Sequence, residues 1–274
     1  MLCGGTTMSD KADRFDLAVF AGQSNMAGRG NAAMAIKCNK NAGFEYKAIS
    51  NPNGLMPVSE PFGLGEERIG GIYDINPDGS SKRTGSMVSA LIDTYFHQCG
   101  KKIIGVCASM GGTSTAQWKE NYIKDAVSRL DAAKLFLTNN DIRIDNIFIV
   151  WSQGETDGDN NVCAEEYIKN LKYLFNEFKL HGAEKCFLIQ IGHYNYIRYP
   201  QGGIEHDKKY EVIRKAQSTI CTNDKDFVMI GSFEPYISQM KDQFHYDQNA
   251  YNAVGKAAGK AIAEYYKKLA KSIV

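Results

Sequence analysis

Five short apolar runs recur along the chain, and a segment with helical periodicity separates each run from the next. The runs are the one that ends at Gly22 and residues 102–108, 144–151, 186–191 and 227–230. The segments with helical spacing of apolar residues are 86–98, 121–139, 164–180, 206–221 and 247–267. Apolar runs of this length are typical of buried strands, and strands that alternate with helices form parallel sheets through crossover connections. The pattern predicts a three-layer α/β/α protein with a doubly wound, five-stranded parallel sheet.

The chain divides into a short polar beginning and one long domain. Residues 1–14 are polar and are expected to be loose, whereas residues 15–274 carry the alternation without an internal repeat or a low-complexity linker. Residues 27–82 interrupt the alternation, because they are rich in Gly, Asn and Pro and only weakly periodic. Long segments of this kind inside compact domains are usually functional or disordered. We expect this one to form a loop-rich insertion that walls a cleft.

Composition and charge exclude several classes of protein. The 274 residues carry a formal net charge of +1, which leaves no electrostatic excess for binding nucleic acid or a membrane surface. No apolar run approaches the ~20 residues of a membrane span, and the first residues lack the basic and apolar parts of a signal peptide. The expected location is therefore the cytoplasm. The seven cysteines include no CxxC pair, so reduced thiols fit better than disulfides or a zinc site, and neither a metal nor a cofactor is expected.

Polar residues follow three of the predicted strands at the point where each apolar run ends. They are residues 22–25 (GQSN), 109–113 (SMGGT) and 152–155 (SQGE). In an open parallel sheet, ligands bind in the crevice beyond the carboxyl ends of the strands. Ser24 would present its hydroxyl there, with Gly22 allowing a tight exit from the strand and Asn25 offering an amide beside the hydroxyl. Ser and Asn are also common helix N-caps, so this motif by itself is compatible with a structural role.

Asp242 and His245 stand in a polar segment just before the last predicted helix. A spacing of three residues allows the carboxylate to hold one ring nitrogen of the histidine while the other nitrogen accepts a proton from a serine. The same residues are also compatible with ordinary polarity near the start of a helix. Among the other histidines, His193 ends a predicted strand and is the alternative general base.

Four motifs occur in order over nearly the whole chain: GQSNM at residues 22–26, GGT at 111–113 followed by Trp118, WSQGE at 151–155, and DxxH at 242–245. Together they resemble the SGNH (GDSL-type) hydrolase superfamily, and within it the sialate O-acetylesterase and acetylxylan esterase group, carbohydrate esterase family six. The resemblance implies a flavodoxin-like sheet. It also implies deacetylation of carbohydrate esters without a metal, so the expected partner is a small-molecule or oligosaccharide acetyl ester.

The same resemblance implies roles for the matching residues. Ser24 would be the nucleophile, His245 the general base, and Asp242 the residue that orients the histidine. The backbone N–H groups of Ser24 and of Gly111 or Gly112 would form the oxyanion hole, with Gly111 slightly favoured by the spacing of the motif. These donors matter because they bind the developing oxyanion more strongly than the ground-state carbonyl.

The third motif departs from the usual pattern, and several of its roles stay open. The superfamily usually supplies an Asn side chain to the oxyanion hole at this motif, and Gln153 is the candidate substitute donor. Glu155 could support the catalytic histidine, compete with Asp242 for that role, or organise the loop by accepting backbone N–H bonds. Ser152 stands where His is common and Thr156 where Ser is expected, but neither departure touches the triad chemistry.

Candidates for substrate binding rest on composition alone. Arg29, Trp118 and Tyr194 lie in segments that should border the cleft, as do Tyr196 and Tyr199. Aromatic faces stack on sugar rings, and Arg29 could bind a carboxylate such as that of a sialic acid. The aromatic residues would fit equally well as packing between the loops.

Two other interpretations are compatible with the sequence. Residues 107–111 (CASMG) lack one glycine of the Gly-x-Ser-x-Gly nucleophile elbow of α/β-hydrolases, which makes Ser109 the alternative nucleophile. A protein of the same fold could also bind carbohydrate without hydrolysing it, although a binding module has no need of Ser24, Asp242 and His245 together. Release of acetate by the purified protein separates an esterase from a binding protein.

Overall fold

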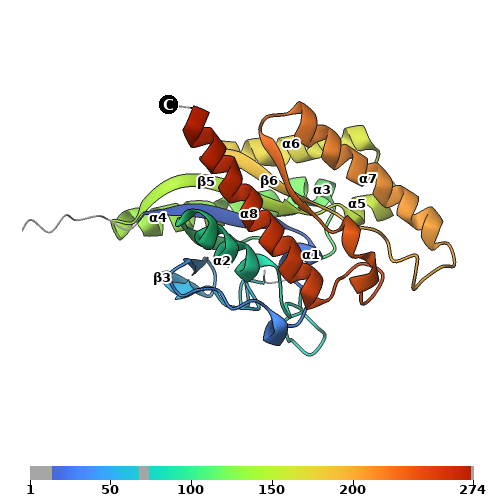
Figure 1. The fold of residues 1–274 in the computed structure, drawn as a ribbon, viewed down its shortest axis with the longest axis horizontal. Coiled ribbons are helices and arrows are strands. Elements are labelled where there is room, and N and C mark those ends of the chain that lie inside the picture. Colours follow the sequence, from blue (N-terminus) through green and yellow to red (C-terminus); the bar gives the residue numbers. More distant parts are fainter. Residues whose placement is uncertain (1–13, 68–73, 273–274) are drawn as a thin grey trace, which may run out of the picture.

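The computed structural model describes residues 14–67 and 74–272, so the predicted loose segment 1–14 lies outside it except for Arg14. The centre is a seven-stranded sheet in the order β3-β2-β4-β1-β5-β6-β7 (Figure 1). The strands are β1 (Arg14–Gly22), β2 (Gly43–Lys47), β3 (Asn51–Pro57), β4 (Lys102–Cys107), β5 (Arg143–Ser152), β6 (Lys185–Gln190) and β7 (Phe227–Ser232).

Helices of very different lengths connect the strands. The longer ones are α2 (Val88–Cys99), α4 (Ile123–Asn139), α6 (Ala164–Leu180), α7 (Gly203–Asn223) and α8 (Gln248–Ser272). The shorter ones are α1 (Ser24–Ala27), η1 (Ala32–Met34), α3 (Thr115–Gln117), η2 (Trp118–Tyr122), α5 (Glu155–Asp159) and η3 (Glu234–Gln239). Within the described residues, no helix combines the length and the apolar content that crossing a membrane requires.

The doubly wound α/β/α fold is confirmed, but the predicted number of strands is wrong. The five predicted strands are β1, β4, β5, β6 and β7, and the segment expected to be loop supplies two more. β2 pairs in parallel with β4, and β3 turns back to pair antiparallel with β2 at the edge of the sheet. β3 contains two prolines, which sheets tolerate at their edges, and none of its residues is buried. A strand without an apolar run is not visible in the hydrophobic pattern.

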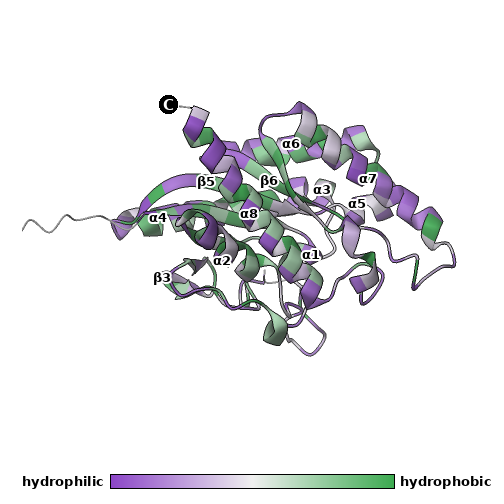
Figure 2. Ribbon diagram, in the orientation of Figure 1, coloured by the Kyte–Doolittle hydropathy of each residue, from purple (hydrophilic) through white to green (hydrophobic). Residues whose placement is uncertain are grey.

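Alternate residues of the strands face two layers of helices. In β1, Leu17 and Val19 belong to the core cluster that includes residues of α4, α6 and α7, whereas Ala18 and Phe20 belong to the cluster that includes residues of α2 and α8. Figure 1 shows α2 and α8 together on one side of the sheet. In Figure 2 the strands are largely apolar, while the outward sides of α7 and α8 are polar. Both faces of the sheet are therefore covered.

The order of the strands places a crevice at the carboxyl ends of β1 and β5. From β1 the chain forms β2 and β3 on one side and returns to β4 next to β1. It then crosses to β5 on the other side of β1, with β6 and β7 following outward. The order β4-β1-β5-β6-β7 is the flavodoxin-like one, in which ligands bind where the direction of winding reverses. The segments that leave β1, β4 and β5 at this edge are the ones that carry the polar motifs.

Candidate active site

Ser24 is the first residue of α1 and is separated from the end of β1 by Gln23 alone. Gly22 permits the tight exit from the strand, because its φ is +132° and a Cβ there would lie 2.0 Å from the carbonyl oxygen of Ser152 on β5. A residue with a side chain does not fit this close approach of two strands. The side-chain oxygen of Gln23 accepts hydrogen bonds from two backbone N–H groups of residues 154–156. The loops after β1 and β5 are thereby tied together.

His245 and Asp242 come from the loop between η3 and α8, and His245 is 221 residues from Ser24 in the sequence. His245 Nε2 lies 2.9 Å from Ser24 Oγ, and His245 Nδ1 lies 2.9 Å from Asp242 Oδ2. With the ring proton on Nδ1, the histidine donates to the aspartate and its Nε2 accepts from the serine hydroxyl. The structure thus brings these three residues into one hydrogen-bonded chain.

The environment of Asp242 keeps its carboxyl group ionised. Burial alone would raise its pKa, but the hydrogen bond and charge of His245 lower the pKa to about 2, together with two backbone N–H donors. Those donors are the N–H groups of Phe244, at 2.8 Å, and of His245 itself, at 2.7 Å. The carboxylate is therefore a fixed acceptor for the Nδ1 proton at neutral pH.

Asn25 links the segment of Ser24 to the loop that carries His245. Its side-chain nitrogen donates to Glu155 Oε1 at 2.6 Å and to the carbonyl oxygen of Phe244, the residue before the histidine, at 3.1 Å. Its side-chain oxygen accepts from the hydroxyl of Tyr251 on α8 at 2.7 Å. Glu155 thus contacts the neighbour of Ser24, whereas Asp242 contacts the ring of His245. This arrangement favours a role for Glu155 in organising the loops, although the bond that it accepts comes from the side chain of Asn25 and not from the backbone N–H groups that were expected.

We expect the free energy of unfolding to depend on pH because of the carboxyl group of Glu155. Burial raises its pKa to about 7, against the opposing effect of the Asn25 hydrogen bond, and its Oε2 has no hydrogen-bond partner among the described residues. The folded protein therefore keeps a proton that the unfolded chain releases near the ordinary pKa of 4.5. This contribution to stability is present below that value and is lost as the pH rises through about 7.

Glu155→Gln should consequently gain stability relative to the wild-type protein as the pH rises from about 5 to about 7.5. The expected gain in the free energy of unfolding is about 3 kcal/mol at most, since one pKa unit corresponds to about 1.4 kcal/mol. Urea unfolding of both proteins at the two pH values measures it. A difference between the proteins that is the same at both values would mean that Glu155 exchanges no proton in this range.

A cavity of about 250 Å³ opens over Ser24 and His245. Its lining residues are Gln23, Ser24, Arg29, Lys82, Gly112, Glu155, Thr156, Asp159, Phe244 and His245. Sequence reasoning missed Lys82, Asp159 and Phe244 as lining residues. Phe244 stands beside a motif residue, but no motif signals the other two, which the fold brings to the cavity. Across residues 14–67 and 74–272, no group of three or more His, Cys, Asp or Glu side chains could hold a metal ion.

The structure distinguishes the two glycines proposed for the oxyanion hole. The N–H of Gly111 donates to Asp74 Oδ2 at 3.1 Å, so it is already engaged. Gly112 lines the cavity instead. The N–H of Ser24 belongs to the first turn of α1, where backbone donors have no acceptor within the helix. The geometry therefore favours Gly112, in contrast to the expectation from motif spacing.

Gln153 does not fit the role of an oxyanion donor. Its side-chain nitrogen donates to the carbonyl oxygen of Thr113 at 2.9 Å and to the carboxylate of Asp157, which engages both of its hydrogens. The side chain is completely buried and does not belong to the lining of the cavity. Gln153 instead ties the loop after β5 to the loop after β4, and the expectation for this residue is corrected accordingly.

Four of the five candidates for substrate binding, Trp118, Tyr194, Tyr196 and Tyr199, do not line the cavity. Trp118 is completely buried, and its ring packs edge-on against Trp151 with centroids 5.0 Å apart. Tyr194 packs against Phe244 with ring centroids 5.9 Å apart and does not belong to the lining of the cavity. Arg29 is the candidate that does line it. Trp118 and Tyr194 thus follow the other interpretation that the sequence allowed, packing between the loops, because apolar packing and sugar stacking select the same residue types.

The alternative base and nucleophile are held by other partners. His193 Nδ1 lies 2.8 Å from Asp207 Oδ2, and its ring packs against Tyr196. Ser109 is buried, and its Oγ accepts a hydrogen bond from Arg83 Nη1 at 2.9 Å. Neither residue belongs to the lining of the cavity over Ser24. Both therefore fit structural roles better than catalytic ones.

Comparisons with known proteins identify the family of the chain. The family model described as "Carbohydrate esterase, sialic acid-specific acetylesterase" matches residues 14–264, whereas no curated protein sequence matches. A solved structure from Arabidopsis thaliana is 16% identical with a TM-score of 0.63, covering 94% of this chain and 98% of that one. The structure of NanS is 13% identical with a TM-score of 0.63, covering 94% and 99%. These structures share the fold, and the family match shows that the chain belongs to the sialic acid-specific acetylesterase family of carbohydrate esterases and is a carboxylic ester hydrolase.

Proposed function

We propose that this protein removes O-acetyl groups from carbohydrates through an acyl-enzyme formed on Ser24. The observation that carries the proposal is the unbroken chain of hydrogen bonds from Asp242 through His245 to Ser24, which ends in the floor of a cavity. A serine, a histidine and an aspartate in this order of contact form the constellation that activates a hydroxyl for attack on an ester.

In the first half of the reaction, Ser24 Oγ attacks the acetyl carbonyl carbon while His245 Nε2 takes the hydroxyl proton. The carbonyl oxygen becomes an oxyanion, for which the N–H groups of Ser24 and Gly112 are the donors. As the tetrahedral intermediate collapses, the bond to the sugar oxygen breaks and His245 gives that oxygen its proton. Asp242 accepts the Nδ1 hydrogen bond throughout and stabilises the imidazolium.

In the second half, water replaces the sugar. His245 Nε2 takes a proton from the water as its oxygen attacks the acetyl group on Ser24. The second tetrahedral intermediate collapses to acetic acid, and the proton returns to Ser24 Oγ. Both halves use the same donors and the same base, so the proposed chemistry requires no group beyond those of the cavity and the triad.

The lining of the cavity carries two basic side chains, which can bind a sugar carboxylate, and two acidic ones, Glu155 and Asp159. Arg29 and Lys82 line the cavity on the side of the loop-rich segment, and cations recognise carboxylates through charge-assisted hydrogen bonds. The acidic Asp159, in the same lining, is hydrogen-bonded by the hydroxyl of Tyr210 at 2.9 Å. The description of the family names sialic acid, which is an acidic sugar. We therefore propose acetylated sialic acid ahead of neutral acetylated xylan.

A panel of acetylated sialic acid, acetylated xylan and simple acetyl sugars, scored by the acetate released, tests the proposed substrate. The acidic sugar should give the highest kcat/KM, and Lys82→Gln should lower that value about tenfold while changing the value for the neutral esters less than about twofold. Equal values for acidic and neutral esters would contradict the preference. Binding of acetylated glycans without any release of acetate would instead identify a carbohydrate-binding protein.

A further inference from the structure

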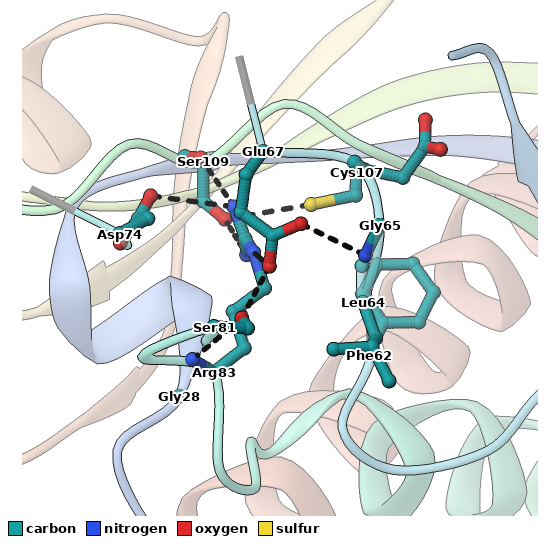
Figure 3. A network of polar contacts seen from close by, with 12 residues as sticks. Gly28, Phe62, Leu64, Gly65, Glu67, Asp74, Ser81, Arg83, Cys107 and Ser109 are labelled. Carbon is teal, nitrogen blue, oxygen red and sulfur yellow. Dashed lines mark hydrogen bonds and ion pairs between the residues drawn. The ribbon is translucent and has the colours of Figure 1, made fainter. Parts of the chain in front are cut away.

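A buried group of polar side chains anchors the loop after β4, which carries Gly111 and Gly112 (Figure 3). We call this group the Arg83 network, and its members are Glu67, Asp74, Ser81, Arg83 and Ser109. The side chain of Arg83 is 1% exposed. Its Nη1 donates to Ser109 Oγ at 2.9 Å, and its Nη2 donates to the carbonyl oxygen of Ser109 at 2.8 Å. The guanidinium thus holds Ser109, near the start of this loop, by two hydrogen bonds.

Asp74 connects the Arg83 network to two parts of the proposed active site. Its Oδ2 accepts the N–H of Gly111 at 3.1 Å and lies 3.4 Å from Arg83 Nη2. Its Oδ1 lies 2.5 Å from Nη2 of Arg29, which lines the cavity. The carboxylate is buried, so water screens these interactions little. One carboxylate therefore holds both the loop after β4 and the guanidinium in the wall of the cavity.

The loop after β4 needs an anchor of this kind. Gly111 and Gly112 have no side chains to pack, and Gly112 has a φ of +67°, in the region that glycine enters freely. Two consecutive glycines do not hold the direction of an N–H group by themselves. An oxyanion hole, in contrast, is effective because its donors are already aimed when the charge develops. A hydrogen bond from Gly111 to a fixed carboxylate restrains the chain immediately before the N–H of Gly112.

We propose that Asp74 and Arg83 are positioning residues that aim the N–H of Gly112 at the oxyanion and hold Arg29 in the wall of the cavity. The inference rests on the proposed function, because it presumes an oxyanion hole at Gly112. Neither residue lines the cavity, so both act through the groups they hold. Buried ion pairs contribute little net stability, because desolvation offsets their attraction. The position of the Arg83 network beside the loop after β4 is therefore better explained by its effect on the orientation of that loop than by a contribution to stability.

Asp74→Asn tests the proposal, with p-nitrophenyl acetate as an uncharged substrate. The variant keeps the size of the side chain but removes the charge that faces Arg29 and Arg83. We expect kcat to fall about tenfold to hundredfold, since misplaced donors weaken the binding of the transition state, while KM changes less than about threefold. The acid limb of the pH–rate profile should stay where it is in the wild-type enzyme, because Asp74 does not contact His245.

Glu67→Gln is the matched control. Glu67 belongs to the same network, with Oε1 3.5 Å from Arg83 Nε and Oε2 accepting the N–H of Gly65 at 2.8 Å, but it holds neither the loop after β4 nor Arg29. We expect both variants to lower Tm, because each deprives the buried guanidinium of Arg83 of a counter-charge, and only Asp74→Asn to lower kcat. An equal fall of kcat in both variants would assign the network a purely structural role.

Other outcomes are equally decisive. A folded Asp74→Asn protein whose kcat lies within twofold of the wild-type value would overturn the proposal. If Asp74→Asn does not fold, Arg83→Lys replaces it, because lysine keeps the charge but not the two hydrogen bonds to Ser109; an unchanged kcat would then overturn the proposal as well. A different result would contradict the proposed function. The wild-type protein would then not hydrolyse the ester, or the Ser24→Ala variant would hydrolyse it as fast as the wild-type protein does.

Discussion

Replacing Ser24 by alanine is expected to lower kcat/KM for p-nitrophenyl acetate by a factor of about 10⁴ to 10⁶. Removal of the hydroxyl leaves no nucleophile beside His245, so only binding and oxyanion stabilisation remain. The loss should appear in kcat, with the fold intact by circular dichroism, because Ser24 Oγ has a cavity on one side and the imidazole on the other. Stopped-flow release of p-nitrophenol would show a burst in the wild-type enzyme and none in the variant.

Ser109→Ala is the control for this experiment. Its hydroxyl accepts from Arg83, and the backbone carbonyl that accepts the second guanidinium N–H remains in the variant. We expect this variant to keep at least about a tenth of the wild-type kcat, since it loses one hydrogen bond and no reacting group. Activity that survives Ser24→Ala but not Ser109→Ala would transfer the role of nucleophile to Ser109.

Asp242→Asn should lower kcat by a factor of about 10⁴. An asparagine at this position can donate a hydrogen bond to Nδ1, which stabilises the tautomer with its proton on Nε2 and leaves His245 unable to accept the proton of Ser24. The low pKa of Asp242, about 2, means that the wild-type carboxylate supports the histidine throughout the neutral range. Steady-state kinetics at about pH 7.5, together with the tautomer of the histidine from ¹⁵N chemical shifts, measure both effects.

Glu155→Gln tests whether Glu155 or Asp242 supports His245, a question that the sequence left open. Glu155 accepts from Asn25 and does not contact the imidazole, so its neutral variant should lower kcat less than about tenfold. A loss as large as that of Asp242→Asn would show that the hydrogen bonds around Asn25 contribute as much to the alignment of the triad as the aspartate does. A small loss in Asp242→Asn combined with a large one in Glu155→Gln would exchange the roles of the two residues.

The edge of the sheet shows where reasoning from hydrophobic pattern ends. β1, β4, β5, β6 and β7 each contribute residues to the core clusters on both faces of the sheet, and this requires the apolar runs that the sequence displays. β2 and β3 lie beyond β4, and β3 is exposed, so its stabilisation comes from pairing with β2 rather than from burial of side chains. Hydrogen bonds between backbones do not require particular side chains, so the hydrophobic pattern of the sequence does not predict this strand pairing.

At the polar motifs, too, the sequence predicted some features and tertiary contacts decided others. Ser24, Asp242 and His245 were recognised because their chemistry demands these residue types at the ends of elements, and the structure places them within hydrogen-bond reach. Gly111 and Gly112 are the same residue type, so the sequence does not show which N–H is free to face the cavity. The structure distinguishes them, because the N–H of Gly111 donates to Asp74 from a distant segment. The amide of Gln153 could likewise face the cavity or Asp157, and the sequence does not distinguish the two. In the structure, the packing of the loops directs this amide to Asp157.

The sequence by itself therefore determined the class of the fold, five of the seven strands and the residue types of the proposed triad, because these follow from burial and from chemical necessity. The tertiary structure decided which glycine lines the cavity, which carboxylate meets the imidazole, and that Arg29 and Lys82 share a wall with Ser24. Those choices depend on contacts between segments far apart in the chain. The order of the strands creates such contacts, and local sequence does not encode that order.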